Sequence, residues 1–253
     1  MGPLHHGEGG PEELTERDDH KGVRPVGEPV HGFAPPPLPG AAPILTRWVR
    51  LERMSAERDA AAIHAAVVGR DWLWDYMPNG PYSTAEDLLT WMRDVAGGED
   101  PCFYCIFDPD AASSAALGYA AFMRMDRGAG VIEIGNIMLA PAIHGARIGS
   151  AALMAMIGWA FKAGYRRVEW KCNALNAPSR RAALRFGFRF EGVFRQHMIV
   201  KGRNRDTAWF AITDRDWVTL SHAHDDWLSP ENFDRRGQQL RSLSGMTRTG
   251  LQG

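Results

Sequence analysis

The loop from Ala142 to Ser150 combines residue types that can bind a phosphate. It follows an apolar strand end at Leu139 and leads into a predicted helix. A helix N-terminus carries unpaired backbone N–H groups and a partial positive charge, and small residues let a phosphate approach those groups. The loop is therefore a candidate pyrophosphate site, although a glycine-containing loop that only turns the chain has the same composition. The residues that would form the site are Gly145, Ala146, Arg147, Ile148, Gly149 and Ser150.

The loop Ala142–Ser150, called the phosphate loop below, differs from the two common nucleotide-binding loops. Neither G-x-G-x-x-G nor G-x-x-x-x-G-K-[ST] occurs here. The loop also lies in mid-chain, after predicted antiparallel strands rather than after the first strand of a parallel sheet. A dinucleotide-binding or Walker-type site is therefore disfavoured.

A second polar segment, Asn173–Ser179, follows a predicted strand and opens a short helix. Asn176 stands just before Ala177-Pro178, which suits its side chain to cap that helix. The same side chain is a candidate ligand contact, and the two roles can coexist.

Together these segments resemble the GNAT superfamily of acyl-CoA-dependent N-acyltransferases, in its ribosomal-protein N-acetyltransferase-like (RimJ/RimL-like) branch. The family's phosphate loop, [Q/R]-x-x-G-x-[G/A], corresponds to His144–Gly149, with His144 in place of Gln or Arg and Arg147 in place of the central Gly. A glycine-like backbone angle at Arg147 would strain the loop, whereas ordinary angles would not. The family's second motif, N-x-x-S-x(7)-G-F, matches Asn176, Ser179, Gly187 and Phe188. The likeness covers roughly residues 44–222.

The resemblance implies an α/β (α+β) fold whose mixed, mostly antiparallel sheet is flanked by helices and splayed at an acyl-CoA cleft. Acetyl-CoA, the implied acyl donor, would lie where the strand Val131–Leu139 separates from the strand Arg167–Cys172. Asn176 would contact the pantetheine or the thioester end, with Ser179 nearby, and no metal is implied. The pantetheine arm would pair with the backbone of Ile137, Met138 and Leu139.

The implied reaction is direct attack of a neutral primary amine on the thioester in a ternary complex. A backbone N–H of Met138 or Leu139 would stabilise the oxyanion. Glu133 is the candidate base, acting through water, unless it is a surface strand carboxylate. Lys171 stands where some relatives carry a Glu, and Ala183 stands where many carry a proton-donating Tyr. These absences favour an acceptor whose amine loses its proton easily.

The aromatic loop with Trp72, Trp74 and Tyr76 is expected to line the acceptor side, because aromatic walls suit apolar or cationic groups. Some of these rings could instead anchor the first two helices. His197 is a further candidate, with a structural role in its strand as the alternative. The run Lys201–Arg205 is interpreted as a solvated hairpin turn.

The elements that must position these residues follow from periodicity and capping signals. Their predicted order is β-α-α-β-β-β-α-β-α-β-β, followed by a helix with Trp217 and Trp227 that covers the core or forms a dimer contact. The sequence therefore leaves open whether the protein forms a homodimer. The predicted strands are 47–54, 102–107, 116–125, 131–139, 167–172, 192–200 and 206–213. The predicted helices are 56–68, 83–97 with a Ser83–Glu86 capping box, 150–163 and 177–186.

Residues 1–43 are rich in Gly, Pro, His and charge, which predicts a disordered or polyproline-like arm. The N-acetyltransferase domain is assigned to residues 44–222. Residues 223–253 form a C-terminal extension, which is expected to be polar and loosely held after Pro230.

Composition excludes several classes. The chain of 253 residues is 45% hydrophobic and 23% charged, which is ordinary for a soluble globular protein. A net charge of −1 gives no global reason to bind nucleic acid or an anionic membrane. No apolar run reaches the ~20 residues that span a bilayer, and no signal peptide is evident. The cysteines 102, 105 and 172 are interpreted as buried thiols, which favours the cytoplasm.

Two functional alternatives stay open on the sequence. One is a different acyl donor such as succinyl-CoA, which a cation near the acyl end of the cleft would favour. The other is a non-catalytic acyl-CoA-binding module, motivated by the two missing catalytic groups.

Overall fold

The computed structural model describes residues 24–111 and 114–252. Its elements follow the predicted order, with a short first strand and a last helix added. The strands are β1 Ile44–Leu45, β2 Arg50–Arg53, β3 Cys102–Phe107, β4 Gly118–Asp126, β5 Val131–Leu139, β6 Arg167–Asn173, β7 Arg189–Val200 and β8 Arg203–Thr213. The helices are α1 Ala56–Val67, α2 Ala85–Ala96, α3 Arg147–Lys162, α4 Ala177–Arg185, α5 Asp214–Leu228 and α6 Leu243–Gln252. Short 3-10 helices cover Asp71–Trp74, Pro141–Ile143 and Pro230–Asn232.

Within the described residues the strands form one eight-stranded sheet in the order β1-β2-β3-β4-β5-β6-β8-β7. Every neighbouring pair is antiparallel except β5 and β6, which run parallel. The expected mixed, mostly antiparallel sheet is confirmed.

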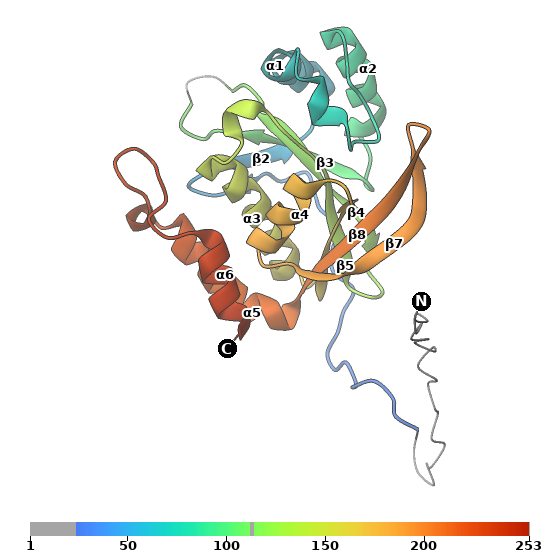
Figure 1. Ribbon diagram of the computed structural model, residues 1–253, viewed down its shortest axis with the longest axis vertical. Coiled ribbons are helices and arrows are strands. Elements are labelled where there is room, and N and C mark those ends of the chain that lie inside the picture. Colours follow the sequence, from blue (N-terminus) through green and yellow to red (C-terminus); the bar gives the residue numbers. More distant parts are fainter. Residues whose placement is uncertain (1–23, 112–113, 253) are drawn as a thin grey trace, which may run out of the picture. The chain divides into compact units, whose positions relative to one another are not determined.

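Helices cover both faces of this sheet because side chains on a strand alternate between its faces. Tyr104 and Ile106 of β3 belong to the core cluster that includes residues of α3, α4, α5 and α6. Phe103 and Cys105 of the same strand belong to the cluster formed with α1 and α2. Figure 1 shows α1 and α2 side by side and well separated from α5 and α6.

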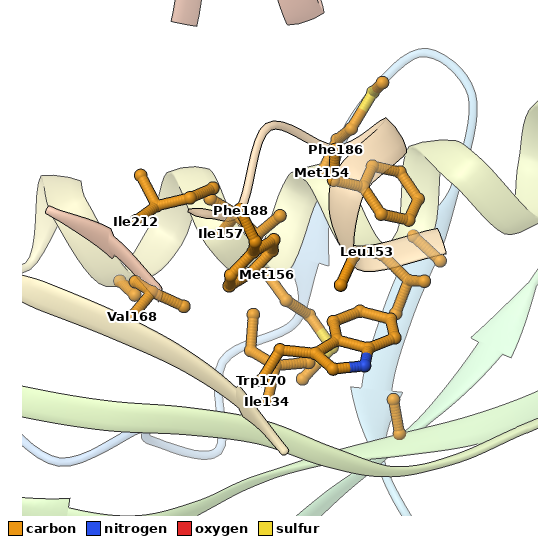
Figure 2. Close-up of a cluster of buried hydrophobic side chains, with 14 of the residues drawn as sticks. Ile134, Leu153, Met154, Met156, Ile157, Val168, Trp170, Phe186, Phe188 and Ile212 are labelled. Atoms are coloured by element: carbon orange, nitrogen blue, oxygen red, sulfur yellow. The ribbon is translucent and has the colours of Figure 1, made fainter. Parts of the chain in front are cut away.

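Helix α3 packs closely against the middle of the sheet. Its residues 149–154 are all buried, which explains why this helix is apolar almost all round. Figure 2 shows Leu153 and Met156 of α3 above Ile134 of β5 and Trp170 of β6. The N-terminus of α3, which carries the phosphate loop, is therefore fixed relative to β5 and β6.

β5 and β6 pair over only three rungs. Val131, Ile132 and Glu133 pair with Arg167, Val168 and Glu169, and no later residue of β5 pairs with β6. β5 continues to pair with β4 as far as Leu139, and β6 continues to pair with β8 as far as Asn173. The two strands thus separate beyond Glu133, where the splay was predicted.

Two bulges shape the strands beside this opening. Tyr119 pairs with Met138, and Ala121 pairs with Gly135. β5 therefore advances by three residues where β4 advances by two, so the bulge lies in β5. Asn136 has a φ of 48° there, which Asn tolerates better than most residues. A second bulge in β4 lies at Arg124, also with a φ of 48°. Such bulges redirect side chains and backbone groups locally.

The hairpin between β7 and β8 is tighter than predicted. Lys201 and Gly202 have φ values of 48° and 71°, as a two-residue type I′ turn requires. The ladder resumes at once, with Val200 opposite Arg203. The interpretation of Arg205 as a solvated turn residue is therefore wrong, because Arg205 is a half-buried residue of β8.

The end of the chain is also more ordered than predicted. Helix α6 packs against α5, and its Leu243 and Thr247 are fully buried. Trp227 of α5 is 2% exposed, and its indole N–H donates to Gln239 at 2.7 Å. A loosely held tail is wrong for the described part, and Trp227 covers the core of its own chain.

The capping box of α2 is shifted by one residue. Thr84 caps the helix and Asp87 completes the reciprocal hydrogen bonds, in place of Ser83 and Glu86. The helix still ends at the predicted glycines, since Gly97 follows its last residue.

The chain divides after residue 33 into two units. Residues 24–33 contain no helix or strand. In the second unit, backbone carbonyls within Pro36–Gly40 accept hydrogen bonds from Tyr104 at 2.6 Å and Tyr165 at 3.1 Å. Residues 1–23 lie outside the described residues, and the three-part domain division stays a prediction. None of the helices in the described part is long and apolar enough to cross a membrane.

His224 of α5 links the C-terminal extension to the end of α4. Its Nε2 donates to the carbonyl of Phe186 at 2.9 Å, and the imidazole is 2% exposed. Burial lowers the pKa of His224 from 6.5 to about 4, and the cation of Arg185 lowers it further against the effect of the hydrogen bond. The folded state therefore holds the neutral ring, and the unfolded state takes up a proton below pH ~6.5.

We expect His224 to make folding stability fall as the pH is lowered from about 6.5 towards 4. Between pH 7.5 and 5 its contribution to the free energy of unfolding should fall by about 2 kcal/mol. Urea unfolding of the wild type and of His224→Gln at both pH values measures this. The variant should lose this part of the pH dependence, and an identical pH dependence in both proteins would contradict the assignment.

Candidate functional site

A cavity of about 210 Å³ opens where β5 and β6 separate. Its walls come from β4, β5, β6, the start of α4, β7, β8 and the aromatic loop. We call it the central cavity. The residues that line it and matter below are Tyr76, Arg124, Glu133, Ile137, Lys171, Asn173, Asn176, Ser179 and Arg205.

Glu133 lies on the last rung that joins β5 to β6, directly beside Glu169. Two carboxylates in this arrangement repel each other unless a cation lies between them. Lys171, two residues further along β6, supplies that cation, with its Nζ 3.0 Å from Glu133 and 2.6 Å from Glu169. The position at which relatives carry a Glu is thus occupied by the counter-ion of the carboxylate pair.

Arg124 completes the environment of Glu133. Its guanidinium donates to both carboxylate oxygens, at 2.9 and 3.0 Å, from the bulge in β4. The Glu133 side chain is 3% exposed, so the alternative of a surface carboxylate is wrong. Because both cations occupy this carboxylate, a proton could reach Glu133 only if Arg124 or Lys171 moved away or if a water molecule relayed it.

Gly135 leaves the room that this network needs. A Cβ at Gly135 would lie 2.7 Å from the sulfur of Met123 and 3.1 Å from Oε1 of Glu133. Any side chain there would push against the carboxylate from within its own strand.

Asn176 caps helix α4, as the sequence suggested. Its Oδ1 accepts a hydrogen bond from the N–H of Ser179 at 3.1 Å, and Asn176 also lines the central cavity. The hydroxyl of Ser179 accepts from the indole N–H of Trp170 at 3.0 Å. The motif therefore fixes the start of α4 against β6, and Asn176 keeps its amide NH₂ for other partners.

The phosphate loop leads into α3 at Arg147, which is the first helical residue. Ala146 precedes it without a side-chain capping bond, so the first N–H groups of α3 have no such partner. Arg147 has no positive φ, so the loop avoids the strain that a glycine-like angle would impose there. A Cβ at Gly149 would lie 2.7 Å from the carbonyl oxygen of Ile143, which explains the glycine.

Beside the phosphate loop lies a larger cavity of about 780 Å³, which we call the outer cavity. Arg147, Arg181 and Arg185 line it together with Gly145, Ala146, Gly149 and Ser150 but not Ile148, and none of the carboxylates among the described residues lines it. The guanidinium of Arg147 stacks between the rings of Trp48, at 3.7 Å, and Phe233, at 4.3 Å. This arrangement suits a ligand that carries several phosphate charges.

Only some of the residues predicted to line the acceptor side lie around a common cavity. A third cavity of about 370 Å³, the acceptor cavity, is lined by Trp74, Tyr76 and the β7–β8 hairpin. Trp74 is 2% exposed and belongs to the core with α1 and α2, so it anchors these helices as well. Trp72 lines neither this cavity nor the central one, and its ring contacts His144.

His197 is not brought to either cavity. It is exposed on β7, where its Nδ1 lies 3.0 Å from the hydroxyl of Thr207 and its ring contacts Trp209. This placement favours the structural alternative for His197.

Three cationic residues of the site were not identified from the sequence. Arg124 lies at a bulge, and Arg205 was assigned to a turn. Lys171 was noted only because it replaces a Glu found in some relatives. Lys171 was detectable in principle, because Glu169 and Lys171 share one face of a strand. A bulge at Arg124 has no comparable sequence signal.

The remaining sequence expectations concern thiols and metals. The cysteines 102, 105 and 172 are free and buried, as predicted. Ala183, at the position where relatives carry Tyr, is a fully buried residue of α4. In the part of the chain that the structure describes, no cluster of three His, Cys, Asp or Glu residues could hold a metal ion.

Comparisons with known proteins agree with this geometry. A family model described as an acetyltransferase (GNAT) domain matches residues 49–189. A GCN5-related N-acetyltransferase from Brucella melitensis is 40% identical, with a TM-score of 0.83 over 87% of this chain and 100% of that one. A protein from Chromobacterium violaceum ATCC 12472, described as a probable acetyltransferase of the GNAT family, is 34% identical, with a TM-score of 0.73 over 79% and 100%.

A more distant structure shares the fold. RimL, described as a ribosomal L7/L12 alpha-N-protein acetyltransferase, is 21% identical, with a TM-score of 0.58 over 68% of this chain and 94% of that one. No curated protein sequence matches the chain.

The effect of removing the Glu133 charge on the free energy of unfolding should depend strongly on whether Lys171 is present. In the wild type, Glu133→Gln leaves Lys171 with one carboxylate fewer and should lower the free energy of unfolding by about 3 kcal/mol. In a Lys171→Met background the same change relieves the repulsion from Glu169 and should cost little or stabilise. Urea unfolding of the four proteins in this double-mutant cycle should give a coupling of about 3 kcal/mol. Additive effects would show that Lys171 does not hold the two carboxylates together.

Proposed function

This chain belongs to the acetyltransferase (GNAT) family, and on that premise we propose that its central cavity is where the acetyl group of acetyl-CoA passes to a primary amine. The observation that carries the proposal is the separation of β5 from β6 directly beside the N-terminus of α3. A thioester donor with a phosphate-bearing end requires a slot for its chain and an adjacent anion site for its phosphates. The separated strands would supply the slot, and the N-terminus of α3 would supply the anion site.

The residues present fit acetyl-CoA. In the slot, the β5 backbone from Ile137 through Met138 to Leu139 has no partner strand on the β6 side within the described residues. The ring of His144 bonds to the carbonyl of Leu139 at 2.9 Å, so the pantetheine amides would pair with the other backbone groups of this edge that do not face β4. The N–H groups of Gly145 to Ser150 would receive the pyrophosphate, and the arginines of the outer cavity would balance the phosphate charge. Asn176 would contact the pantetheine or thioester end, with Ser179 holding the helix start.

Acetyl-CoA supplies an activated acyl group, so the chain need only place and assist the amine. The amine nitrogen bonds to the thioester carbonyl carbon, the C–S bond breaks, the amine loses a proton and the thiolate leaves. An N–H of Met138 or Leu139 would stabilise the oxyanion, and much of the rate would come from holding both reactants in contact. Glu133 would receive the amine proton through water, while Arg124 and Lys171 hold its carboxylate in place.

The acceptor is proposed to carry an easily deprotonated amine. An α-amine, with a pKa of about 7.7–8.0, is about one-tenth neutral at pH 7, whereas a lysine amine is neutral in about one part in a few thousand. RimL, a fold relative, is described as acting on a protein α-amine. Trp74 and Tyr76 would line the path of the acceptor. Three free thiols favour the reducing cytosol as the site of action.

We expect calorimetric titration to show that the wild type binds acetyl-CoA with a dissociation constant in the range of about 1–100 μM. Gly149→Ala should weaken binding at least about tenfold, because its Cβ must displace the carbonyl of Ile143 and with it the loop backbone. Gly97→Ala is the matched control, since its Cβ meets nothing within 4 Å and its φ is negative.

Turnover is measured as CoA release from acetyl-CoA in the presence of a panel of α-amines and lysine-like amines. The proposal predicts release that depends on the amine and is greater for α-amines at pH 7. Binding without release from any amine, or no binding by the folded wild type, would contradict the proposed function.

A further inference from the structure

The central and acceptor cavities meet at three residues. Tyr76, Asn173 and Arg205 line both of them. Tyr76 and Asn173 have partners in the chain: the hydroxyl of Tyr76 donates to the carbonyl of Leu175, and Oδ1 of Asn173 accepts from its N–H. Arg205 is the charged residue at this junction.

Arg205 differs from the other cations of the site because its charge is not paired. Arg124 and Lys171 form ion pairs with Glu133, and the ammonium of Lys201 donates to the carbonyl of Trp74 at 2.9 Å. Arg205 has no ion pair or side-chain hydrogen bond to any described residue, and its Nε is buried without a partner. A guanidinium that is partly removed from water normally has a carboxylate or phosphate partner.

The surroundings of Arg205 make the missing partner an anion. The charged residues that line the central cavity are Arg124, Lys171 and Arg205 against the single carboxylate of Glu133. Those that line the acceptor cavity are Lys201, Arg203 and Arg205 against the carboxylates of Asp71 and Asp75, so cations outnumber carboxylates in both cavities. Burial lowers the pKa of Arg205 from its usual value, the nearby thiol of Cys172 raises it, the charge of Arg124 lowers it and that of Glu133 raises it. Glu133 is already bonded to two cations, so the excess positive charge lies on the side of Arg205.

We propose that Arg205 binds a carboxylate of the substrate at the junction of the two cavities, beside the reacting amine. The guanidinium fork matches a carboxylate bidentately, which a lysine could not do as well. This inference rests on the proposed acyl transfer and names its substrate class. The carboxylate comes either from the acceptor, as in an α-amino acid, or from the acyl group, as in the succinyl donor.

The two sources place the carboxylate differently along the reaction. An amino-acid acceptor presents its carboxylate next to its amine, so the amine would enter the central cavity while the side chain occupies the acceptor cavity. A dicarboxylic acyl group would instead reach Arg205 from the thioester. In both cases Arg205 selects the substrate and takes no part in the proton transfer.

The acceptor arm of the test compares α-amino acids with their carboxamides, using acetyl-CoA. If the acceptor carries the carboxylate, the wild type should prefer the acid, and Arg205→Gln should raise the KM of the acid by about 10- to 100-fold while changing that of the carboxamide less than about threefold. Arg205→Lys should restore part of the preference.

The donor arm compares succinyl-CoA with acetyl-CoA, using a carboxamide acceptor. If the acyl group carries the carboxylate, kcat/KM for succinyl-CoA should exceed that for acetyl-CoA, and Arg205→Gln should reverse the order. Arg195→Gln is the matched control, because Arg195 is an exposed arginine of the paired strand β7 that lines neither cavity.

The inference is overturned if neither arm shows a preference for the carboxylate-bearing substrate, or if Arg205→Gln lowers kcat/KM equally for all substrates. In either case, amine-dependent CoA release would still support the proposed function. If no amine is turned over, the proposed function fails, and titration of succinate and of glycine into the CoA-loaded protein decides the inference alone. The inference is supported if succinate or glycine binds to the wild type and to Arg195→Gln but not to Arg205→Gln. It is overturned if neither compound binds, or if Arg205→Gln binds them as the wild type does.

Discussion

The site depends on the last rung between β5 and β6. There Glu133 and Glu169 lie side by side, and the pairing of the two strands stops. Lys171 bridges the carboxylates from one side and Arg124 holds Glu133 from the other. Without these cations the two negative charges would destabilise the rung, and the point at which the strands part would not be fixed. The opening is thus defined by an electrostatic arrangement as much as by the backbone.

Everything that would touch a donor is arranged around this opening. β5 remains paired with β4 as far as Leu139, which leaves its other edge free, while β6 is held by β8. Helix α3 packs over both strands through its buried side chains (Figure 2), and this packing fixes the position of its N-terminus. Positive charge then continues from the central cavity to the outer one, where Arg147, Arg181 and Arg185 lie and where no carboxylate of residues 24–111 or 114–252 lines the cavity.

The sequence predicted much of this because the relevant signals are local. The apolar strand ends, the loop of small residues and the Asn176 cap each occupy a few consecutive positions, and their order along the chain resembled one family. The family-level fold and the separation of β5 from β6 followed from it. Non-local features could not be predicted in this way. The pairing of Arg124 with Glu133 depends on a bulge, and the burial of Arg205 depends on a two-residue turn that the Lys201–Arg205 run concealed. His197 and Trp72 were plausible by residue type, but the register of β7 and the path of the aromatic loop direct them elsewhere.

The most direct test of the central claim is amide hydrogen exchange measured with and without acetyl-CoA. The account predicts new protection at Ile134–Leu139, along the edge of β5 that β6 leaves free, and at Arg147–Ser150 at the start of α3. The amides of Arg167–Glu169, already paired with β5, should change little. Protection of both segments together would support a donor that spans the opening and the phosphate loop. Protection confined to the β7–β8 hairpin, or found at neither segment while acetyl-CoA is bound, would contradict the account.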